Sequence, residues 1–171
     1  MERKPLLKLI VGLGNPDGKY KNTYHNIGHL FIDAVNENSK FKIQSLKLLK
    51  TDGFMNTAGV FVVRALKKQG LRPETLLVVH DDSDLLIGTY KLAFGRGAAG
   101  HHGVESVIKN LKTKNFWRLR IGVRPKPKPG ALRLKADQFV LKKITLGSRK
   151  VLDSVFKKAS AAVFGDNQGG L

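Results

Sequence analysis

Cysteine is absent from this 171-residue sequence, acidic residues are scarce, and no long hydrophobic run occurs. Without cysteine the chain forms no disulfide and has no thiolate nucleophile or thiolate metal ligand. No apolar run approaches the roughly 20 residues with which a helix spans a bilayer, so no membrane partner is expected. Charged residues precede the apolar run at 6–13, as in a signal peptide, but that run contains Lys8 and no small-residue cleavage site follows it. The sequence therefore predicts a cytoplasmic protein.

The shortage of acidic residues leaves a large positive charge. There are 31 lysines and arginines and 13 aspartates and glutamates, which gives a net charge of +18. The charge is concentrated between Lys109 and Lys158, where 16 basic residues accompany only Asp137 and Asp153. Such an imbalance causes repulsion in a compact fold, so it predicts a polyanionic partner, with a generally basic protein as the alternative. Nucleic acid is favoured over a membrane surface because this segment has no aromatic-rich amphipathic helix.

The length and the hydrophobic fraction of 42% predict one globular domain over residues 1–171, with a frayed tail from about 165. Runs of aliphatic and β-branched residues predict strands at 6–13, 41–49, 75–79, 89–94 and 116–123. In the last of these strands Arg118 and Arg120 share one face, and Trp117 and Leu119 share the other.

Apolar residues at helical spacing predict four helices, at 26–36, 57–68, 104–111 and 148–164. The second helix should bury Val60, Val63 and Leu66, and Ser148 should cap the last helix. The core stripe expected along the last helix comprises Val151, Leu152, Val155, Phe156, Ala159 and Val163. One further helical turn is expected at 137–141, and the lysine- and proline-rich stretch 125–130 should be an exposed loop.

Strands that alternate with helices predict an α/β fold, a single-domain three-layer α/β/α sandwich around a mixed, mostly parallel sheet. The tight connection from Asp81 to Tyr90 accounts for one antiparallel pair. Ligands bind at the carboxyl ends of the strands in such sheets, so polar residues placed there are site candidates.

Three polar clusters lie at predicted strand ends or in the loops that leave them. They are Asn15 with His25, Asn56 after Phe54-Met55, and Asp81 with His101-His102. A histidine beside a carboxylate activates water near neutral pH, because the carboxylate stabilises the imidazolium that forms when the imidazole takes a proton. Asparagine side chains can hold a water molecule or a carbonyl oxygen. With no cysteine and no activated serine, direct attack by water is the simplest chemistry.

Other kinds of site are less well supported. A metal site could be assembled from His25, His80, His101, His102 and Asp81, but no HxxxH spacing or acidic triad accompanies them. The glycine-rich loop at 95–103 could cradle a phosphate with backbone N–H groups, yet it lacks the Lys-Ser/Thr ending of a P-loop. Gly12-Leu13-Gly14-Asn15-Pro16 fails as a dinucleotide fingerprint because proline replaces the helix-opening residues. No metal ion and no cofactor are expected.

Six motifs, in order along the chain, carry a resemblance to a known family. They are Val11-Gly12-Leu13-Gly14-Asn15-Pro16, Thr23-Tyr24-His25-Asn26-Ile27-Gly28, Phe54-Met55-Asn56, His80-Asp81-Asp82-Ser83-Asp84-Leu85, Gly100-His101-His102-Gly103 and Arg118-Leu119-Arg120-Ile121-Gly122. Their combination resembles bacterial-type peptidyl-tRNA hydrolase over residues 9–125. The resemblance implies an esterase that cleaves the bond between a peptide and the 3′ ribose of tRNA, and so recycles tRNA from stalled translation. We expect a monomer with peptidyl-tRNA as its partner.

The resemblance also implies roles for individual residues. By position, His25 matches the catalytic base of the family and Asp81 matches its carboxylate partner. Asn15 and Asn56 match asparagines that hold substrate and water. The other residues implied to bind substrate or assist at the site are Tyr20, Asn26, Met55, His101 and His102. Lys91 and Arg120 match basic residues that clamp the 5′-phosphate of tRNA, which agrees with the net charge.

The sequence departs from the family pattern at several positions. His102 replaces a substrate-contacting asparagine, and an imidazole cannot reproduce the donor and acceptor of an amide in one geometry. Tyr24 replaces the usual arginine before the catalytic histidine, and Asp17 stands where glycine is usual. Thr51 and Gly53 replace a proline and a threonine. The stretch between the first helix and Phe54-Met55-Asn56 is shorter than usual.

These departures leave a second function class open, a non-catalytic RNA-binding relative that keeps the fold and the basic surface. Drift away from catalysis would be expected to alter His25, Asp81, Asn15 or Asn56, and all four are present. The hydrolase is therefore the favoured prediction.

Overall fold

A five-stranded sheet forms the centre of the computed structural model, which describes residues 5–38 and 45–165. The strands follow the order β2-β1-β3-β5-β4 across the sheet, and only β4 runs antiparallel to its neighbour. Their bounds are β1 Leu9–Gly12, β2 Lys47–Lys50, β3 Leu76–Leu86, β4 Tyr90–Phe94 and β5 Trp117–Arg124. The first part of the predicted strand at 41–49 and nearly all of the predicted frayed tail lie outside the described residues.

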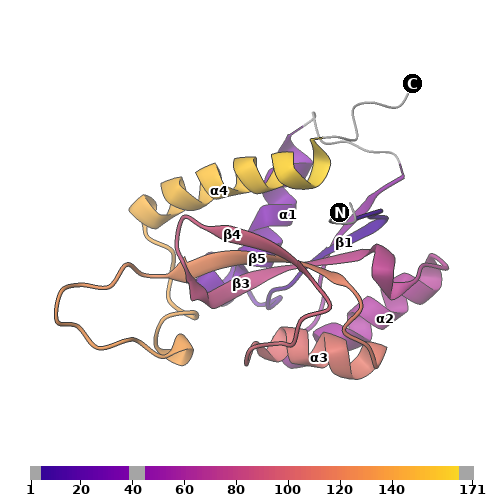
Figure 1. Ribbon diagram of the computed structural model, residues 1–171, viewed down its shortest axis with the longest axis horizontal. Helices are drawn as coiled ribbons and strands as arrows, with labels where there is room; N and C mark the ends of the chain where they lie inside the picture. The colour runs from indigo at the N-terminus through magenta and orange to yellow at the C-terminus, as the bar shows by residue number, and fades with distance from the viewer. Residues whose placement is uncertain (1–4, 39–44, 166–171) are drawn as a thin grey trace.

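Helices cover both faces of the sheet, as the sequence predicts (Figure 1). Helices α1 and α4 pack on one face with Leu77 and Val79 of β3, and helices α2 and α3 pack on the other with Leu76 and Val78. The helix bounds are α1 Ile27–Glu37, α2 Ala58–Lys68, α3 His102–Leu111 and α4 Leu146–Phe164. The predicted α/β/α sandwich around a mixed sheet is confirmed. Within the described ranges, no helix is both long and apolar enough to cross a membrane.

The antiparallel pair does not lie where the sequence placed it. The short turn after β3 does reverse the chain, but β4 pairs with β5, which lies between β3 and β4 in the sheet. β5 supplies the buried Leu119 and Ile121, whereas Lys91 and Leu92 of β4 are exposed. β5 therefore takes the inner position, paired with β3 and β4, and β4 takes the edge.

Strand β3 extends well beyond its predicted end at residue 79. It continues to Leu86 because β5 pairs with it along most of its length, with His80 opposite Arg120 and Asp82 opposite Gly122. Aspartate disfavours strands in isolation, which is why the sequence pattern stopped at Val79. Pairing with β5 overrides this local preference and fixes Asp81 within a rigid strand.

The buried faces of two helices differ from the prediction. Val60 of α2 is 55% exposed and Val63 is only half-buried, whereas Leu66 is buried as predicted. The other buried residues of α2 are mostly small: Ala58, Gly59, Val62 and Ala65. A Cβ atom added to Gly59 would lie 2.0 Å from the carbonyl oxygen of Ser106, so α2 and α3 approach too closely for large side chains between them. On α4, Val151 is 41% exposed and Val163 is only partly buried. Thr145 rather than Ser148 caps α4, since the Thr145 hydroxyl accepts the Ser148 N–H.

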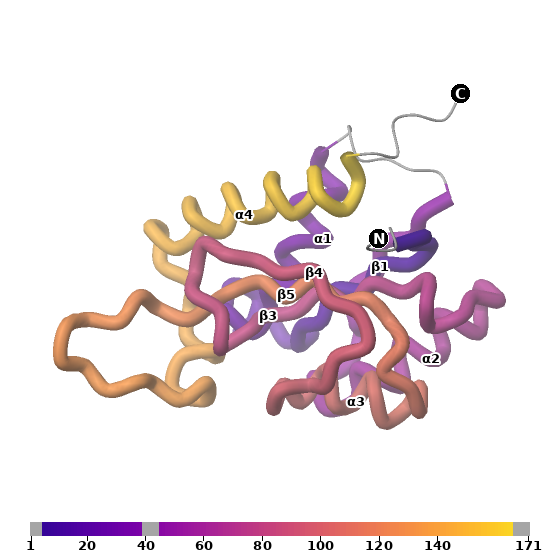
Figure 2. The backbone as a smooth tube through the Cα atoms, viewed as in Figure 1, coloured from indigo at the N-terminus to yellow at the C-terminus, as the bar shows by residue number. Residues whose placement is uncertain are grey.

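The segment between β5 and α4 projects from the sheet as a long loop (Figure 2). Its tip includes the exposed stretch 125–130, as expected, and the predicted helical turn is a 3₁₀ turn at Ala136–Gln138. The segment then returns to the start of α1, where the backbone N–H of His25 donates to the carbonyl of Val140 at 2.7 Å. Two residues earlier, Thr23 forms a β-bridge with Lys143. Residues from the last third of the chain thus join the polar end of the sheet.

Candidate active site

Close packing of α1 on the sheet brings His25 to Asp81. A Cβ atom added to Gly28 would lie 2.4 Å from both the Leu13 nitrogen and the Val79 oxygen, so only glycine lets α1 begin this near to β1 and β3. His25 lies in the 3₁₀ turn Tyr24–Asn26 immediately before α1, and Asp81 lies on β3. Glycine in the first turn of α1 is therefore a condition for the contact between the two side chains.

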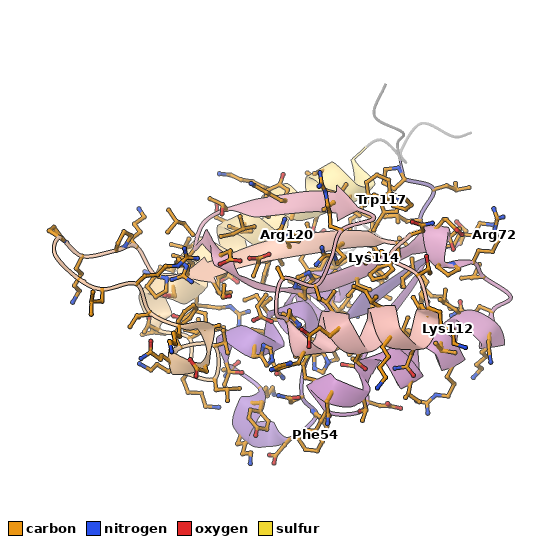
Figure 3. The ribbon with its side chains drawn as sticks, turned by 60° about the horizontal axis from the view of Figure 1, so that its bottom comes forward. Phe54, Arg72, Lys112, Lys114, Trp117 and Arg120 are labelled. Atoms are coloured by element: carbon orange, nitrogen blue, oxygen red, sulfur yellow. The ribbon has the colours of Figure 1, made fainter. Side chains whose placement is uncertain are left out.

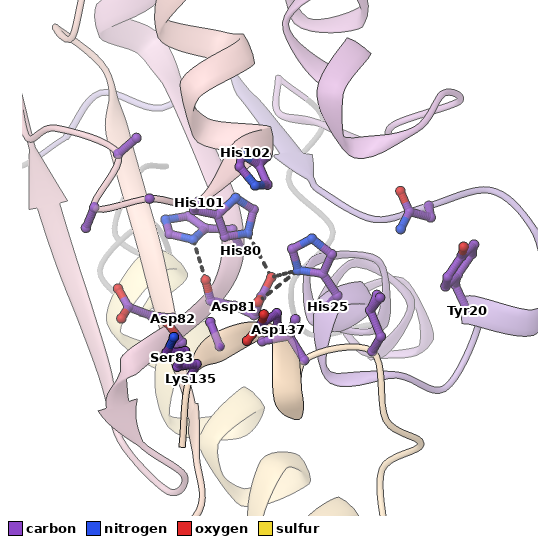
Figure 4. A pocket seen from close by; sticks show the side chains of 17 residues that line it. Tyr20, His25, His80, Asp81, Asp82, Ser83, His101, His102, Lys135 and Asp137 are labelled. Carbon is purple, nitrogen blue, oxygen red and sulfur yellow. Dashed lines mark hydrogen bonds and ion pairs between the residues drawn. The ribbon is translucent and has the colours of Figure 1, made fainter. Parts of the chain in front are cut away.

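The carboxylate of Asp81 is buried and contacts two histidines (Figure 4). Nδ1 of His25 lies 3.0 Å from each of its oxygens, and Nε2 of His101 lies 2.8 Å from Oδ1. His101 is the N-cap of α3, and its Nδ1 accepts the Val104 N–H at 3.3 Å. Because Nδ1 of His101 accepts, its Nε2 carries the proton that is donated to Asp81.

The same reasoning fixes the tautomer of His25. Its Nδ1–H donates to Asp81, so Nε2 holds the lone pair, and no side chain or backbone group in the described parts of the chain bonds to Nε2. Burial lowers the pKa of His25, but the charge of Asp81 and the hydrogen bond to it outweigh burial and raise the pKa above 6.5. Burial also raises the pKa of Asp81, but the two histidines together hold it well below its ordinary value. Asp81 is therefore ionised at neutral pH, and His25 has the arrangement of a general base.

Hydrogen bonds to Asn26 and Met55 fix Asn15 and leave its side-chain amide nitrogen available to a ligand. Its backbone N–H donates to Oδ1 of Asn26 and its carbonyl accepts from Nδ2 of Asn26, both at 2.9 Å. Its own Oδ1 accepts the backbone N–H of Met55, also at 2.9 Å. The amide nitrogen of Asn15 makes no hydrogen bond to any residue that the structure describes, and Asn15 lines the pocket beside His25. Asn15 can thus donate a hydrogen bond to a bound oxygen, and Asn26 acts by positioning it.

A pocket of about 590 Å³ collects most of the predicted site residues. Figure 4 shows His25 between His101 on one side and Tyr20 on the other. The predicted residues that line it are Asn15, Tyr20, His25, Asp81, His101 and His102. Met55 is buried just behind this wall, since its sulfur occupies the space that a Cβ atom on Gly103 would need. The structure therefore brings together Asn15, Tyr20, His25, Asn26, Met55, Asp81, His101 and His102.

Asn56 does not join this group. It lies in the 3₁₀ turn Met55–Thr57, its side chain is exposed, and it does not line the pocket. The sequence predicts Asn56 at the site together with Met55. Within this turn, however, Met55 is buried and Asn56 is exposed to solvent. Phe54, on the other side of Met55, is also exposed (Figure 3).

Sequence reasoning missed the wall that the loop between β5 and α4 contributes. Lys135, Ala136, Asp137, Val140 and Leu141 line the pocket opposite the glycine-rich loop. These residues follow His25 by more than 100 positions, and no local pattern links them to it. The weak helical signal at 137–141 was the only feature that marked this segment.

His102 occupies the rim of the pocket. Its side chain is 79% exposed, and its Nδ1 lies 3.0 Å from Oε2 of Glu105, one turn along α3. The acceptor carboxylate fixes the proton on Nδ1 and leaves Nε2 available toward the pocket.

A basic groove of about 530 Å³ lies beside the pocket, across the glycine-rich loop. Its cationic lining residues are Lys91, Arg96, Arg118 and Arg120. Lys91 and Arg120 lie directly opposite each other on β4 and β5, and Nε of Arg120 donates to Asp82 at 2.7 Å. Figure 3 shows Arg120 on this side of the sheet, with Lys114 and Lys112 near the end of α3. The two predicted phosphate-binding residues therefore share one groove.

The sequence predicts no metal site, although three side chains at the pocket offer atoms that could bind a metal ion. His25, Asp81 and His101 each offer a ligand atom, and these atoms lie within 4.8 Å of one another. However, the two histidine nitrogens in question carry the protons that they donate to Asp81, and the second nitrogen of His101 caps α3. Both nitrogens of His80 have other partners, and Nδ1 of His102 bonds to Glu105. The hydrogen bonding thus favours a carboxylate held by two histidines over a metal-binding arrangement.

The sequence matches a family model described as "Peptidyl-tRNA hydrolase" over residues 9–165. A peptidyl-tRNA hydrolase from Hydrogenobaculum sp. (strain Y04AAS1) is 38% identical over 170 residues, covering 91% of this chain and 88% of that protein. One from Aquifex aeolicus is also 38% identical over 170 residues, covering 90% of this chain and 86% of that protein.

The fold is similar to that of a solved structure as well. The crystal structure of peptidyl-tRNA hydrolase from Acinetobacter baumannii aligns with a TM-score of 0.81 at 28% sequence identity. The alignment covers 98% of this chain and 93% of that one, so the likeness extends over the sheet and all four helices.

Proposed function

The chain belongs to the peptidyl-tRNA hydrolase family, which releases tRNA from peptidyl-tRNA, and we propose that His25 and Asp81 perform the hydrolysis in this protein. One observation carries the proposal. Nδ1 of His25 donates to a buried, ionised Asp81, while Nε2 has its lone pair directed to a 590 Å³ pocket. This pairing gives the imidazole the tautomer and the basicity that a general base needs.

The reaction begins when Nε2 of His25 takes a proton from a water molecule as its oxygen attacks the ester carbonyl carbon. Asp81 stabilises the imidazolium that forms, and His101 keeps the Asp81 carboxylate oriented. The tetrahedral intermediate then collapses, and the bond between the carbonyl carbon and the 3′ ribose oxygen breaks. The ribose oxygen leaves with the proton from Nε2, which yields a free peptide acid, tRNA and neutral His25.

Asn15 supplies the donor that stabilises the oxyanion of this intermediate. Because Oδ1 of Asn15 accepts from Met55, its amide nitrogen is the group that remains for the substrate. Removal of one such donor in other enzymes costs about 10²- to 10³-fold in rate. Asn26 holds the Asn15 backbone at two points and so fixes where that donor points.

The groove beside the pocket binds the 5′ end of tRNA, which lies at the acceptor stem together with the 3′ end that carries the peptide. Lys91 and Arg120 face each other there and provide two cationic side chains for the 5′-phosphate of tRNA. Exposed basic residues along the loop between β5 and α4 extend the positive surface, including Lys126 and Lys128. The net charge of +18 makes this binding strongly dependent on salt, because each phosphate contact releases counterions.

We further propose that the protein acts as a single-domain cytoplasmic monomer that needs no cofactor. The family model spans residues 9–165 as one unit, which supports the single domain. The charge supports a monomer, since two copies at +18 would repel each other. Asn56, which faces solvent outside the pocket, is proposed to contact tRNA rather than the attacking water.

The test is release of N-acetylated amino acid from acylated tRNA by the parent protein and by H25A. We expect H25A to lose at least about 10³-fold in kcat, because it removes the imidazole that Asp81 orients and makes more basic. Binding of H25A to uncharged tRNA, measured by fluorescence anisotropy, should equal that of the parent. Near-normal turnover by H25A would remove His25 from the mechanism.

The same assay addresses the non-catalytic RNA-binding alternative. Such a relative would bind tRNA in a salt-dependent manner and show no turnover with either protein. Turnover by the parent alone supports both the activity and the identity of its base.

A further inference from the structure

One buried histidine has no part in the reaction described above. His80 precedes Asp81 on β3 and is 1% exposed. Its Nδ1 donates to the backbone carbonyl of Asp81 at 2.6 Å, and its ring lies edge-on to the ring of His101 with centroids 4.8 Å apart. His80 therefore contacts both Asp81 and the second histidine that bonds to the Asp81 carboxylate.

His80 is neutral, and its free nitrogen is an acceptor. Burial lowers its pKa well below 6.5, and the neighbouring His101 ring and Arg118 guanidinium lower it further. Because Nδ1 carries the proton, Nε2 has the lone pair, and Nη1 of Arg118 lies 3.4 Å from it. The buried ring thus connects the guanidinium of Arg118 to the main chain of Asp81.

The second terminal nitrogen of the Arg118 guanidinium is linked to the carboxylate of Asp81. Its Nη2 donates to the carbonyl of Gly97 at 2.7 Å. Gly97 lies in the glycine-rich loop that continues to His101, and His101 donates to Oδ1 of Asp81. Nη1 of Arg118 is therefore linked to the Asp81 backbone through His80. Nη2 is linked to the Asp81 carboxylate through the glycine-rich loop and His101.

Arg118 also lines the basic groove, together with Lys91 and Arg120. It is 2% exposed, so its side chain forms the floor of the groove rather than part of its rim. Arg118 is thus the residue that contacts both the groove and the network behind the active site.

We propose that Arg118 and His80 are positioning residues that couple binding of a phosphate in the basic groove to the placement of Asp81 and His101. The proposal rests on the function proposed above, in which the groove takes a phosphate of tRNA. A phosphate over Arg118 attracts its guanidinium and orders the planar fork, whose two N–H groups hold His80 and Gly97. Close packing around the buried ring transmits this ordering to Asp81. The enzyme then reaches its full rate only when a tRNA end occupies both cavities.

The critical variant is R118K, which keeps the positive charge but replaces the two-armed fork with a single ammonium. On acylated tRNA we expect kcat to fall about five- to tenfold, with KM within about threefold of the parent value, as for a coupling of modest size. The K91A variant, which weakens phosphate binding without touching His80 or Gly97, should raise KM instead. A fall in kcat for R118K with unchanged tRNA affinity is the signature of positioning.

A short substrate provides a second readout that a purely structural role would not change. An N-acetylaminoacyl ester of the 3′-terminal trinucleotide fills the pocket but leaves the groove empty. Inorganic phosphate added at millimolar concentration should raise kcat/KM of the parent on this substrate about fivefold and leave R118K unchanged. Sodium sulfate and sodium chloride at matched ionic strength separate binding of a tetrahedral anion from screening.

Because R118K alters a buried residue, H80Q serves as a second variant, and thermal unfolding checks that both are folded. Loss of the phosphate response in folded H80Q would support the link, and an equal response in parent and both variants would overturn it. Absence of any phosphate response in the parent would also overturn it. These outcomes differ from failure of the proposed function, which would appear as activity in H25A.

Discussion

The side-chain oxygen of Asn15 lies 2.9 Å from the backbone nitrogen of Met55, forty positions further along the chain. This hydrogen bond orients the Asn15 amide, because the oxygen is held against the turn that begins at Met55. The nitrogen is then the only part of the amide that can meet the substrate. A residue type that can either donate or accept is thereby restricted to donating.

The N15D variant tests this restriction with almost no change in shape. A carboxylate still accepts the Met55 N–H, so we expect the melting temperature to change by only a few degrees. It cannot donate to an oxyanion at neutral pH, and we expect kcat/KM to fall about 10²- to 10³-fold. The matched control is N26D, which breaks the bond to the Asn15 carbonyl and should lower stability and activity together. Activity of N15D within a few-fold of the parent would show that Asn15 does not donate in the transition state.

The pH dependence of turnover should follow the proton on His25. In the proposed mechanism only neutral His25 acts as the base, and Asp81 raises the pKa of His25 above 6.5 despite its burial. We therefore expect kcat/KM of the parent to rise with pH through a pKa above 6.5. The measurement is kcat/KM on acylated tRNA from pH 5 to 9 at constant ionic strength.

The D81N variant should change both the plateau value of kcat/KM and the pH at which kcat/KM reaches half of that plateau. His101 would donate to the amide oxygen of residue 81, which turns the amide N–H groups toward His25 and forces a lone pair onto its Nδ1. The proton would then sit on Nε2, so the plateau should fall by about 10³-fold or more. Without the negative charge, burial alone acts on His25, and the midpoint should move to lower pH. An unchanged midpoint would mean that Asp81 does not set the basicity of His25.

His102 replaces an asparagine of the family pattern, and the structure places it on the exposed rim of the pocket beside Glu105. If the imidazole only substitutes for the amide, H102N should keep or improve the parent kcat/KM, and stability should change by less than about 0.5 kcal/mol. The comparison variant is E105Q, which removes the carboxylate that orients the ring. A collapse of activity in H102N, with normal folding, would assign His102 a role of its own in this protein.

Acid sensitivity should arise in part from His29, on α1 behind the loop that carries Asn15. Burial and the charge of Lys50 lower its pKa to about 4, although Asp33 and a hydrogen bond to Thr51 act in the opposite direction. Above pH 6.5 His29 is neutral in both the folded and unfolded chains, and its full contribution to stability is present. Between pH 6.5 and about 4 the unfolded chain binds a proton that the folded chain does not, so the free energy of unfolding falls.

Urea unfolding of the parent and of H29Q between pH 4 and 8 measures this contribution. The difference between the two proteins should be constant above pH 6.5 and should change in favour of H29Q as the pH falls toward 4. His80 acts in the same direction in both proteins, so it cancels in the difference. Parallel curves over the whole range would remove His29 as a source of acid sensitivity.

The sequence was sufficient for those parts of the fold that local patterns encode. Alternating aliphatic strands and amphipathic helices predict the layers, and the family resemblance pairs His25 with Asp81 and places His101 at the same site. His25 and His101 lie just before the starts of α1 and α3, and Asp81 lies on β3 just past its predicted end at residue 79. Their convergence follows from parallel strands that end at the same edge of the sheet.

What the sequence could not give depends on contacts between distant segments. β3 runs through Asp81 and Asp82 because β5 pairs with it there, and no local propensity reports that pairing. Val60 is exposed because Gly59 brings α2 against α3. The direction of Asn56 depends on which side of a single 3₁₀ turn faces the core, and spacing from Met55 does not determine it.

The bond between the His25 backbone and Val140 joins two segments that lie more than 100 residues apart in the sequence. Val140 belongs to the wall that the late segment adds to the pocket, so one main-chain hydrogen bond ties His25 to this wall. A displacement of the wall that kept this bond would move His25 relative to Asp81. The placement of His25 and the placement of the late segment are therefore linked through one main-chain contact.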